Sequence, residues 1–320
     1  MKLKRLYSTF KYDLDLIEKE LENAVCSNST LLQNASLQLL KAGGKRIRPV
    51  FVLLSAQFGE YKIDTIKNVA LALELIHMAS LVHDDVIDEA DTRRGRPTIN
   101  YTWDDRMAMY TGDFIFARSL EYMTNISNPI AHKKLAKAIV EVCIGEMVQI
   151  QDKFRFDQTI RDYLRRIKRK TALLIAVSCE LGAIAGKTDE RIYRRLYKFG
   201  YYIGMSFQIT DDILDFTATE KELGKPAGED LRQGNITLPA LYAMQIPELK
   251  AEIIKVNEDT NKEEMQKIIH LIKHSGAIEK SHLLSRRYLD KALHILQELP
   301  ANRAKRPLQE IANYIGKRRH

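Results

Sequence analysis

Apolar residues recur three and four positions apart along most of this chain, and this spacing places them on one face of an α-helix. No stretch alternates apolar and polar residues for long enough to indicate a sheet. No proline interrupts the sequence between Pro129 and Pro226. The pattern therefore predicts an all-α protein, with helices over residues 13–25, 64–90, 104–124, 130–154, 158–185, 189–219 and 236–246.

Short polar or glycine-rich segments separate these helices. SNST (27–30) supplies an N-cap for the helix that follows it, and GGKRIRP (43–49) ends one helix and begins the next at its proline. Gly95 and Pro97 indicate a turn, and LGKPAGEDLRQGN (223–235) is the long glycine-rich loop. The sequence shows no internal repeat, low-complexity tract or linker, so we expect one domain over residues 1–320.

The net charge of +8 would by itself permit nucleic-acid binding. However, most basic residues stand beside acidic ones, as in Glu18-Lys19-Glu20, which is typical of solvated helix faces. The three cysteines lack the spacing of a metal site, and the N-terminal segment lacks the apolar core of a signal peptide. No apolar run of membrane-spanning length is free of charges. We therefore expect a cytoplasmic protein that binds no nucleic acid and has at most peripheral contact with a membrane.

Two aspartate motifs stand out from this background. DDVID contains Asp84, Asp85 and Asp88, and DDILD contains Asp211, Asp212 and Asp215. Residues three and four apart share a helix face, so each motif gathers its carboxylates on one patch at the end of an apolar helix. A single DDxxD would be read as an acidic surface helix end, but two nearly identical copies favour a shared chemical role.

Clustered carboxylates repel one another, by roughly 0.2–0.5 kcal/mol for each like-charged pair one helical turn apart. A divalent cation relieves this repulsion. Oxygen ligands suit Mg²⁺, which binds through one or two carboxylates together with waters and substrate phosphates. The two motifs therefore predict metal sites that could hold a diphosphate between them.

Basic residues near the motifs could bind the same diphosphate. Lys45, Arg46 and Arg48 lie in GGKRIRP, and Arg93 and Arg94 follow the first aspartate motif. Lys170 ends the run RRIKRK, and Lys225 stands at the start of the glycine-rich loop. Arginine can grip phosphate oxygens with two parallel hydrogen bonds, whereas lysine acts as a point charge. Each alone could be ordinary surface charge, so their significance lies in their occurrence with the aspartates.

These segments resemble a known family. GGKRIRP, LVHDDVID followed by RRGRPT, RKTA, and FQITDDILD followed by GKPAGEDLRQGN are similar to the motifs of the trans-prenyl diphosphate synthases. The resemblance covers nearly the whole chain, and it is closest to the catalytic subunits of long-chain synthases built from two different subunits. It implies an isoprenoid synthase-type helical bundle around a central active-site cavity, with the two aspartate helices facing one another.

The resemblance also implies a reaction, in which isopentenyl diphosphate is condensed repeatedly onto an allylic prenyl diphosphate such as farnesyl diphosphate. It implies three Mg²⁺ ions when substrate is bound. Their implied ligands are Asp84, Asp85, Asp88, Asp211, Asp212 and Asp215. The implied contacts of the allylic diphosphate are Arg93, Lys170 and Lys225, and those of isopentenyl diphosphate are Lys45, Arg48, His77 and Arg94. Thr171 and Gln208 would line the reacting carbons, and the released diphosphate would take the proton.

The resemblance further implies a small non-catalytic partner, component I, in a heterodimer, with a homodimer as the alternative if the chain works alone. Ala79, five residues before the first aspartate, is small, which in the family favours a long product. We therefore expect a long-chain product, with the C35 heptaprenyl chain favoured over other hexa- to octaprenyl chains. A heptaprenyl chain would serve as the side chain of menaquinone. Asn235 departs from the pattern, since many relatives carry a basic residue there. The open alternatives are a terpene cyclase, a helical subunit that has lost catalysis, and a basic nucleic-acid-binding protein.

Overall fold

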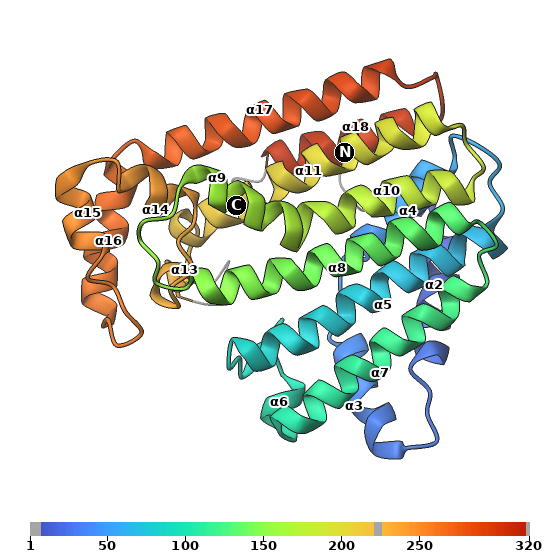
Figure 1. Ribbon diagram of the computed structural model, residues 1–320, viewed down its shortest axis with the longest axis horizontal. Helices are drawn as coiled ribbons and strands as arrows, with labels where there is room; N and C mark the ends of the chain where they lie inside the picture. Colours follow the sequence, from blue (N-terminus) through green and yellow to red (C-terminus); the bar gives the residue numbers. More distant parts are fainter. Residues whose placement is uncertain (1–7, 221–225, 318–320) are drawn as a thin grey trace. The chain divides into compact units, whose positions relative to one another are not determined.

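The computed structural model describes residues 8–220 and 226–317, and it confirms the all-α prediction (Figure 1). The chain divides into two compact units. Unit 1 comprises the described residues of Met1–Leu135, Ser178–Leu196 and Pro300–Pro307. Unit 2 comprises those of Ala136–Val177, Tyr197–Leu299 and Leu308–His320.

Unit 1 is built around α5 (Ile63–Ile87), which packs against α2, α4 and α7. Figure 1 shows α5 and α7 running side by side. The middle of α5, from Val69 to Ile76, is completely or almost completely buried, because this helix is apolar on all sides. The other elements of this unit are α2 (Lys11–Ala24), α3 (Thr30–Lys41), α4 (Ile47–Ala56), α6 (Ile99–Thr102), α7 (Asp105–Thr124) and the strands β1 (Thr92–Arg93) and β2 (Arg96–Pro97).

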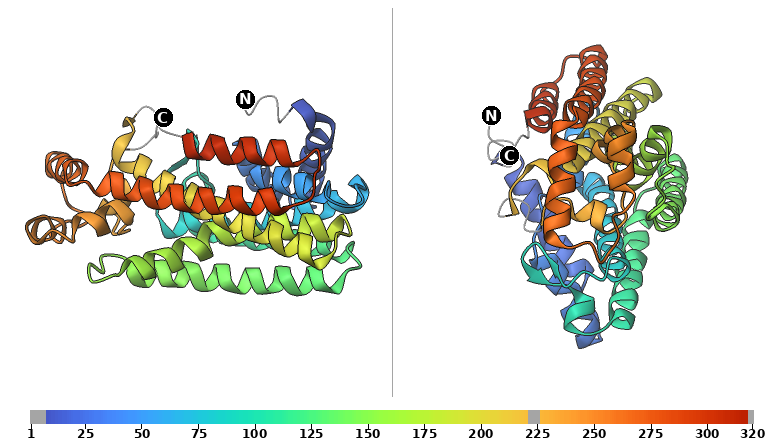
Figure 2. Two further views of the ribbon diagram at one scale, coloured as in Figure 1. Left: turned by 90° about the horizontal axis from the view of Figure 1, so that it is seen from above. Right: turned by 90° about the vertical axis from the view of Figure 1, so that its left-hand side faces the viewer.

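Unit 2 has its own apolar core, to which Tyr163, Ile209 and Phe216 contribute. Its elements are α9 (Ile160–Ile167), η1 (Lys168–Ala172), α13 (Glu229–Arg232), α14 (Leu238–Ala243), α15 (Pro247–Ile253), α16 (Lys262–His274) and α17 (Ala277–Glu298). Within this unit, α14 and α16 pack against the long α17 (Figure 2). Both units receive residues from α8 (Pro129–Asp152), α10 (Leu173–Ala185), α11 (Glu190–Thr217) and α18 (Lys305–Lys317).

The predicted helices are present, with differences at functionally relevant places. The single helix expected over 158–185 contains a π-helical segment, η1, between α9 and α10. The helix expected over 64–90 ends at Ile87, because Glu89 adopts a left-handed backbone with φ 48°. The turn predicted at Gly95 and Pro97 is a small antiparallel hairpin, with Gly95 at its tip and Pro97 in β2, and the glycine-rich loop contains the short helix α13.

Helix α5 is the one described helix that is long and apolar enough to cross a membrane by length and composition, which the sequence pattern did not predict. However, 67% of its most apolar window is buried inside the protein. The core position of α5 accounts for its composition.

Candidate active site

The first aspartate motif occupies the C-terminal turn of α5, where Asp88 is the C-cap and its N–H donates to the carbonyl of Asp84 at 2.8 Å. The C-terminus of a helix carries a partial negative charge, so it adds to the repulsion among the three carboxylates. Asp85 is buried, and its Oδ1 accepts a hydrogen bond from Arg93 Nε at 2.7 Å and lies 2.6 Å from Arg93 Nη2. Burial raises the pKa of Asp85, while Arg93 opposes that shift. One of the three carboxylates is thus already neutralised by the protein.

The hairpin after α5 returns Arg93 towards this motif. Residues 92–93 pair antiparallel with 96–97, and Arg94 and Gly95 both have positive φ, 54° and 73°. Such a two-residue turn matches the twist of the strands that it joins. Asn100 then donates to the carbonyls of Asp85 and Ala90 at 3.4 and 3.3 Å. The hairpin is therefore held against the end of α5.

Four arginines act electrostatically on His77, which lies two helical turns before Asp84. Burial lowers the pKa of His77 well below its usual value, and the charges of Arg48, Arg94, Arg93 and Arg46 lower it further. His77 is therefore neutral at physiological pH, and one ring nitrogen can donate a hydrogen bond while the other accepts one. Unit 1 thus places a dense positive charge beside an aspartate cluster, which suits an anion accompanied by metal.

The buried side chain of Glu74, which the sequence did not single out, faces this charge. Its Oε1 accepts from Arg46 Nη1 at 3.1 Å, and its negative charge acts on Arg48 and Arg94. Burial lowers the pKa of Arg48, and its Nε is a buried donor with no hydrogen-bond partner. An unsatisfied buried donor is costly, so the site is suited to an incoming acceptor such as a phosphate oxygen.

The second motif lies in unit 2, near the C-terminal end of α11. Asp212 is buried, and its Oδ2 accepts from the Tyr163 hydroxyl at 2.6 Å. Its Oδ1 accepts from Gln208 Nε2 at 2.7 Å, and Gln208 Oε1 accepts from Thr171 Oγ1 at 2.5 Å. Burial and then the charge of Asp230 raise the pKa of Asp212 to about 7. The structure therefore joins three predicted site residues in one hydrogen-bonded chain.

The π-helical segment η1 carries Lys170 and Thr171, and π-helical turns are frequent at functional sites. Two glycines allow neighbouring helices to approach this segment. A Cβ on Gly204 would lie 2.5 Å from Ala172 Cα, and one on Gly145 would lie 2.7 Å from Arg169 Cβ. Lys170 Nζ lies 3.4 Å from Glu146 Oε2 on α8. Close packing thus fixes the backbone that presents the two predicted residues.

The glycine-rich loop is tied to the second motif through its backbone. The N–H of Gly228 donates to the carbonyl of Asp215 at 2.8 Å. The N–H of Asn235 donates to the carbonyl of Asp230 at 2.8 Å. Asp230 is part of this loop, and its negative charge acts on Asp212. Lys225, a predicted contact of the allylic diphosphate, lies outside the described residues.

The aspartates present only oxygen donors, which fits a hard divalent cation. Within residues 8–220 and 226–317, no three His, Cys, Asp or Glu side chains converge into a complete metal site. An ion bound by Asp84 and Asp88, or by Asp211, would take its remaining ligands from water and substrate phosphates, as Mg²⁺ usually does.

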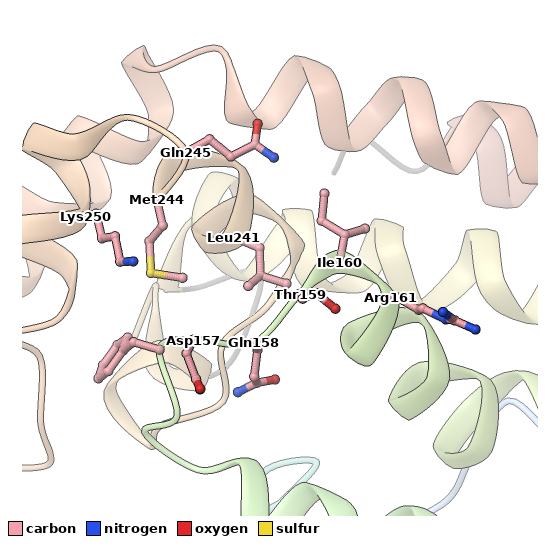
Figure 3. A pocket seen from close by; sticks show the side chains of 10 residues that line it. Asp157, Gln158, Thr159, Ile160, Arg161, Leu241, Met244, Gln245 and Lys250 are labelled. Atoms are coloured by element: carbon pink, nitrogen blue, oxygen red, sulfur yellow. The ribbon is translucent and has the colours of Figure 1, made fainter.

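A cavity of about 440 Å³ in unit 2 contains none of the predicted site residues. Figure 3 shows Gln158 below Leu241 and Met244, with Lys250 on the left and the Arg161 side chain pointing away to the right. Gln158 is occupied by the protein itself, because its Nε2 donates to the carbonyls of Asp152 and Arg155. We assign no role to this cavity.

The structure thus joins Asp85 to Arg93, sets His77 among the arginines, and links Thr171, Gln208 and Asp212. Residues that the sequence did not identify are Glu74, Tyr163, Glu146 and Asp230. A carboxylate in the apolar middle of α5 was the visible sign of Glu74, since a buried charge requires a partner. Tyr163 had no such signal, because its partner lies 49 residues away.

The polyprenyl synthetase family model matches residues 29–272. Heptaprenyl diphosphate synthase component 2 of Geobacillus stearothermophilus is 63% identical over 318 residues, which cover 99% of each chain. The crystal structure of heptaprenyl diphosphate synthase from Staphylococcus aureus has a TM-score of 0.93 at 46% identity, covering 97% of this chain and 99% of that one. A polyprenyl synthase from Caulobacter crescentus CB15, complexed with calcium and isoprenyl diphosphate, has a TM-score of 0.93 at 31% identity, covering 100% and 98%. The chain belongs to the polyprenyl synthetase family.

Proposed function

We propose that the chain is the catalytic subunit of a trans-prenyltransferase that extends an allylic diphosphate, with farnesyl diphosphate as the primer, to heptaprenyl diphosphate. The observation that carries the proposal is the aspartate motif at the C-terminal end of α5, where Asp85 pairs with Arg93, together with Arg48, whose buried Nε has no hydrogen-bond partner. High identity to a heptaprenyl diphosphate synthase component supports the product length.

In this proposal the two units form one catalytic domain over residues 1–320, and both aspartate motifs act on one substrate pair. Mg²⁺, with three ions held in the substrate complex, would supply positive charge opposite the departing diphosphate. The relative bound with calcium and isoprenyl diphosphate supports a divalent cation at such a site. The ligands proposed for the ions are Asp84, Asp85, Asp88, Asp211, Asp212 and Asp215.

The basic side chains divide between the two substrates. Lys45, Arg48, His77 and Arg94 hold the diphosphate of isopentenyl diphosphate, and Arg93, Lys170 and Lys225 hold that of the allylic substrate. Charge stabilisation by these groups favours ionisation of the allylic C–O bond. The double bond of isopentenyl diphosphate attacks the resulting carbocation, and Thr171 and Gln208 lie along the reacting carbons. The released diphosphate removes the proton from the new chain.

The tunnel for the growing chain passes Ala79, which is buried and small. Its neighbour Ser80 donates to the carbonyl of His77 at 2.8 Å, so its hydroxyl is satisfied within the helix. The family resemblance, in which a small residue five positions before the first aspartate favours a long product, supports a long chain. We propose a heptaprenyl product that serves as the side chain of menaquinone.

Two relatives, at 63% and 60% identity, are named component 2 of heptaprenyl diphosphate synthase, which supports a heterodimer with a small component 1 subunit. A homodimer is the alternative if the chain is active alone. The enzyme is proposed to work in the cytoplasm, with at most peripheral contact with a membrane that receives the product.

The test incubates the chain with Mg²⁺, farnesyl diphosphate and radiolabelled isopentenyl diphosphate, with and without the component 1 subunit, and separates the products by length. We expect a C35 product, and we expect Asp84→Ala and Asp211→Ala to lower turnover by about 10²–10³-fold, the loss typical of one preorganised electrostatic group. Near-normal turnover in both variants would refute the assignment. Conversion of farnesyl diphosphate without isopentenyl diphosphate would indicate a cyclase instead.

A further inference from the structure

Arg46 differs from the other basic residues of GGKRIRP because the protein already occupies its guanidinium. Its Nε and Nη2 donate to the two carboxylate oxygens of Glu18, each at 2.7 Å. Its Nη1 donates to Glu74 Oε1 at 3.1 Å. The Arg46 side chain is only 10% exposed. A bidentate pair of this kind fixes the orientation of the guanidinium as well as its position.

Glu18 and Glu74 come from different helices, α2 and α5, so Arg46 joins the loop to both. Glu74 precedes His77 by three residues, which places both on the same side of α5. The Arg46 ion-pair network (Glu18, Arg46 and Glu74) therefore ends beside the histidine at which the other arginines converge. A loop fixed in this way is fixed relative to His77.

The backbone at Arg46 also determines the course of the chain. Arg46 has φ 43° and ψ 41°, a left-handed conformation that is strained for a residue other than glycine. It is the N-cap of α4, and its carbonyl accepts from the N–H of Val50 at 3.2 Å. The conformation of this one residue therefore sets the direction between Lys45, which precedes it, and Arg48 in the first turn of α4.

Gly44 brings a further arginine into the same arrangement. A Cβ at Gly44 would lie 2.9 Å from Arg94 Nη1 and 3.2 Å from Arg46 Nη1. The loop backbone is therefore in close contact with both guanidiniums. Arg46 faces its carboxylates, whereas the side chain of Arg48 retains a buried Nε with no hydrogen-bond partner.

We propose that Arg46 is a positioning residue, which with Glu18 and Glu74 holds the loop so that Lys45, Arg48 and Arg94 converge on the diphosphate of isopentenyl diphosphate. Arg46 itself does not contact that diphosphate. This inference rests on the proposed function for the identity of the ligand. It distinguishes Arg46 from two neighbours of the same charge in the same seven residues.

The test compares Glu18→Gln with Glu20→Gln in the full chain together with its component 1 subunit. Glu20 lies on the same helix and makes a single ion pair, 3.3 Å from Lys67, away from the Arg46 network. Calorimetry measures the Kd for isopentenyl diphosphate, and steady-state rates give the KM for each substrate and kcat.

We expect Glu18→Gln to raise the Kd and KM for isopentenyl diphosphate by roughly tenfold, which corresponds to the loss of one charge-assisted contact. The KM for the allylic substrate and kcat at saturation stay within twofold of the parent, and Glu20→Gln changes none of these constants. Arg46→Lys, which keeps the charge but loses the planar fork, raises the same two constants. Circular dichroism checks that each variant is folded.

If Arg46 were a diphosphate ligand, Glu18→Gln would free it, and the Kd for isopentenyl diphosphate would stay unchanged or fall while Arg46→Lys raised it. That result would overturn the inference, as would an equal rise in the KM of both substrates. The proposed function fails differently, because the parent chain with its partner would then bind isopentenyl diphosphate without elongating any allylic primer.

Discussion

Replacing Tyr163 by phenylalanine tests whether the protein must hold Asp212 in place for catalysis. The ring of Tyr163 is fully buried in the core of unit 2, and the substitution retains that packing. It removes only the hydroxyl that donates to Asp212 Oδ2 at 2.6 Å. Gln208 continues to donate to the other oxygen. The carboxylate thus loses one of two restraints.

A hydrogen bond to a charged group contributes about 1.5–3 kcal/mol, and its loss here leaves a buried oxygen unsatisfied. If that amount is lost in the transition state, kcat/KM falls by about 10–150-fold, at 1.36 kcal/mol for each factor of ten. We also expect a higher Mg²⁺ concentration at half-maximal rate, because a mobile carboxylate is a less preorganised ligand.

The assay measures initial rates of isopentenyl diphosphate incorporation over a Mg²⁺ titration. Tyr242→Phe is the matched control, since Tyr242 lies in the same unit and its hydroxyl is not part of the Asp212 network. Tyr163→Phe rates within twofold of the parent at every Mg²⁺ concentration would show that the Tyr163 hydroxyl does not position a catalytic carboxylate.

Two further substitutions test the packing and the charge of the site. Gly204→Ala places a Cβ 2.5 Å from Ala172 Cα, so we expect about 1–3 kcal/mol of destabilisation and a slower reaction; an unchanged melting temperature and rate would show that the π-helical segment adapts freely. The pKa of His77 lies well below 6.5 in the folded chain. Below about pH 6.5 the unfolded chain therefore binds a proton that the folded chain does not. The free energy of unfolding then decreases by up to about 1.4 kcal/mol for each pH unit by which the pH is lowered. His77→Asn should flatten the stability profile below about pH 6.5 in denaturant titrations, and an unchanged slope would contradict a neutral buried His77.

The sequence was sufficient where the information is local. Helical periodicity predicted most helices to within a few residues, since a 3.6-residue repeat of apolar positions is read directly from the chain. The spacing of Asp84 and Asp88 placed both on one turn of helix, as found. The π-helical segment at Lys168–Ala172 was not predicted from the sequence of that helix. It lies in close contact with Gly145 and Gly204 on neighbouring helices, and such contacts exist only in the folded chain.

The physical reason for the different roles within the basic loop came only from the tertiary structure. Arg46 and Arg48 have the same chemistry and lie two residues apart, and only the family resemblance assigned Arg48, and not Arg46, to isopentenyl diphosphate. Glu18, on another helix, occupies one of them and leaves the Nε of the other without an acceptor. Tyr163 and Asp212 likewise meet across 49 residues. Spacing along one helix fixed which aspartates lie on one turn, whereas folding fixed their partners, because hydrogen bonds and ion pairs depend on distance in space.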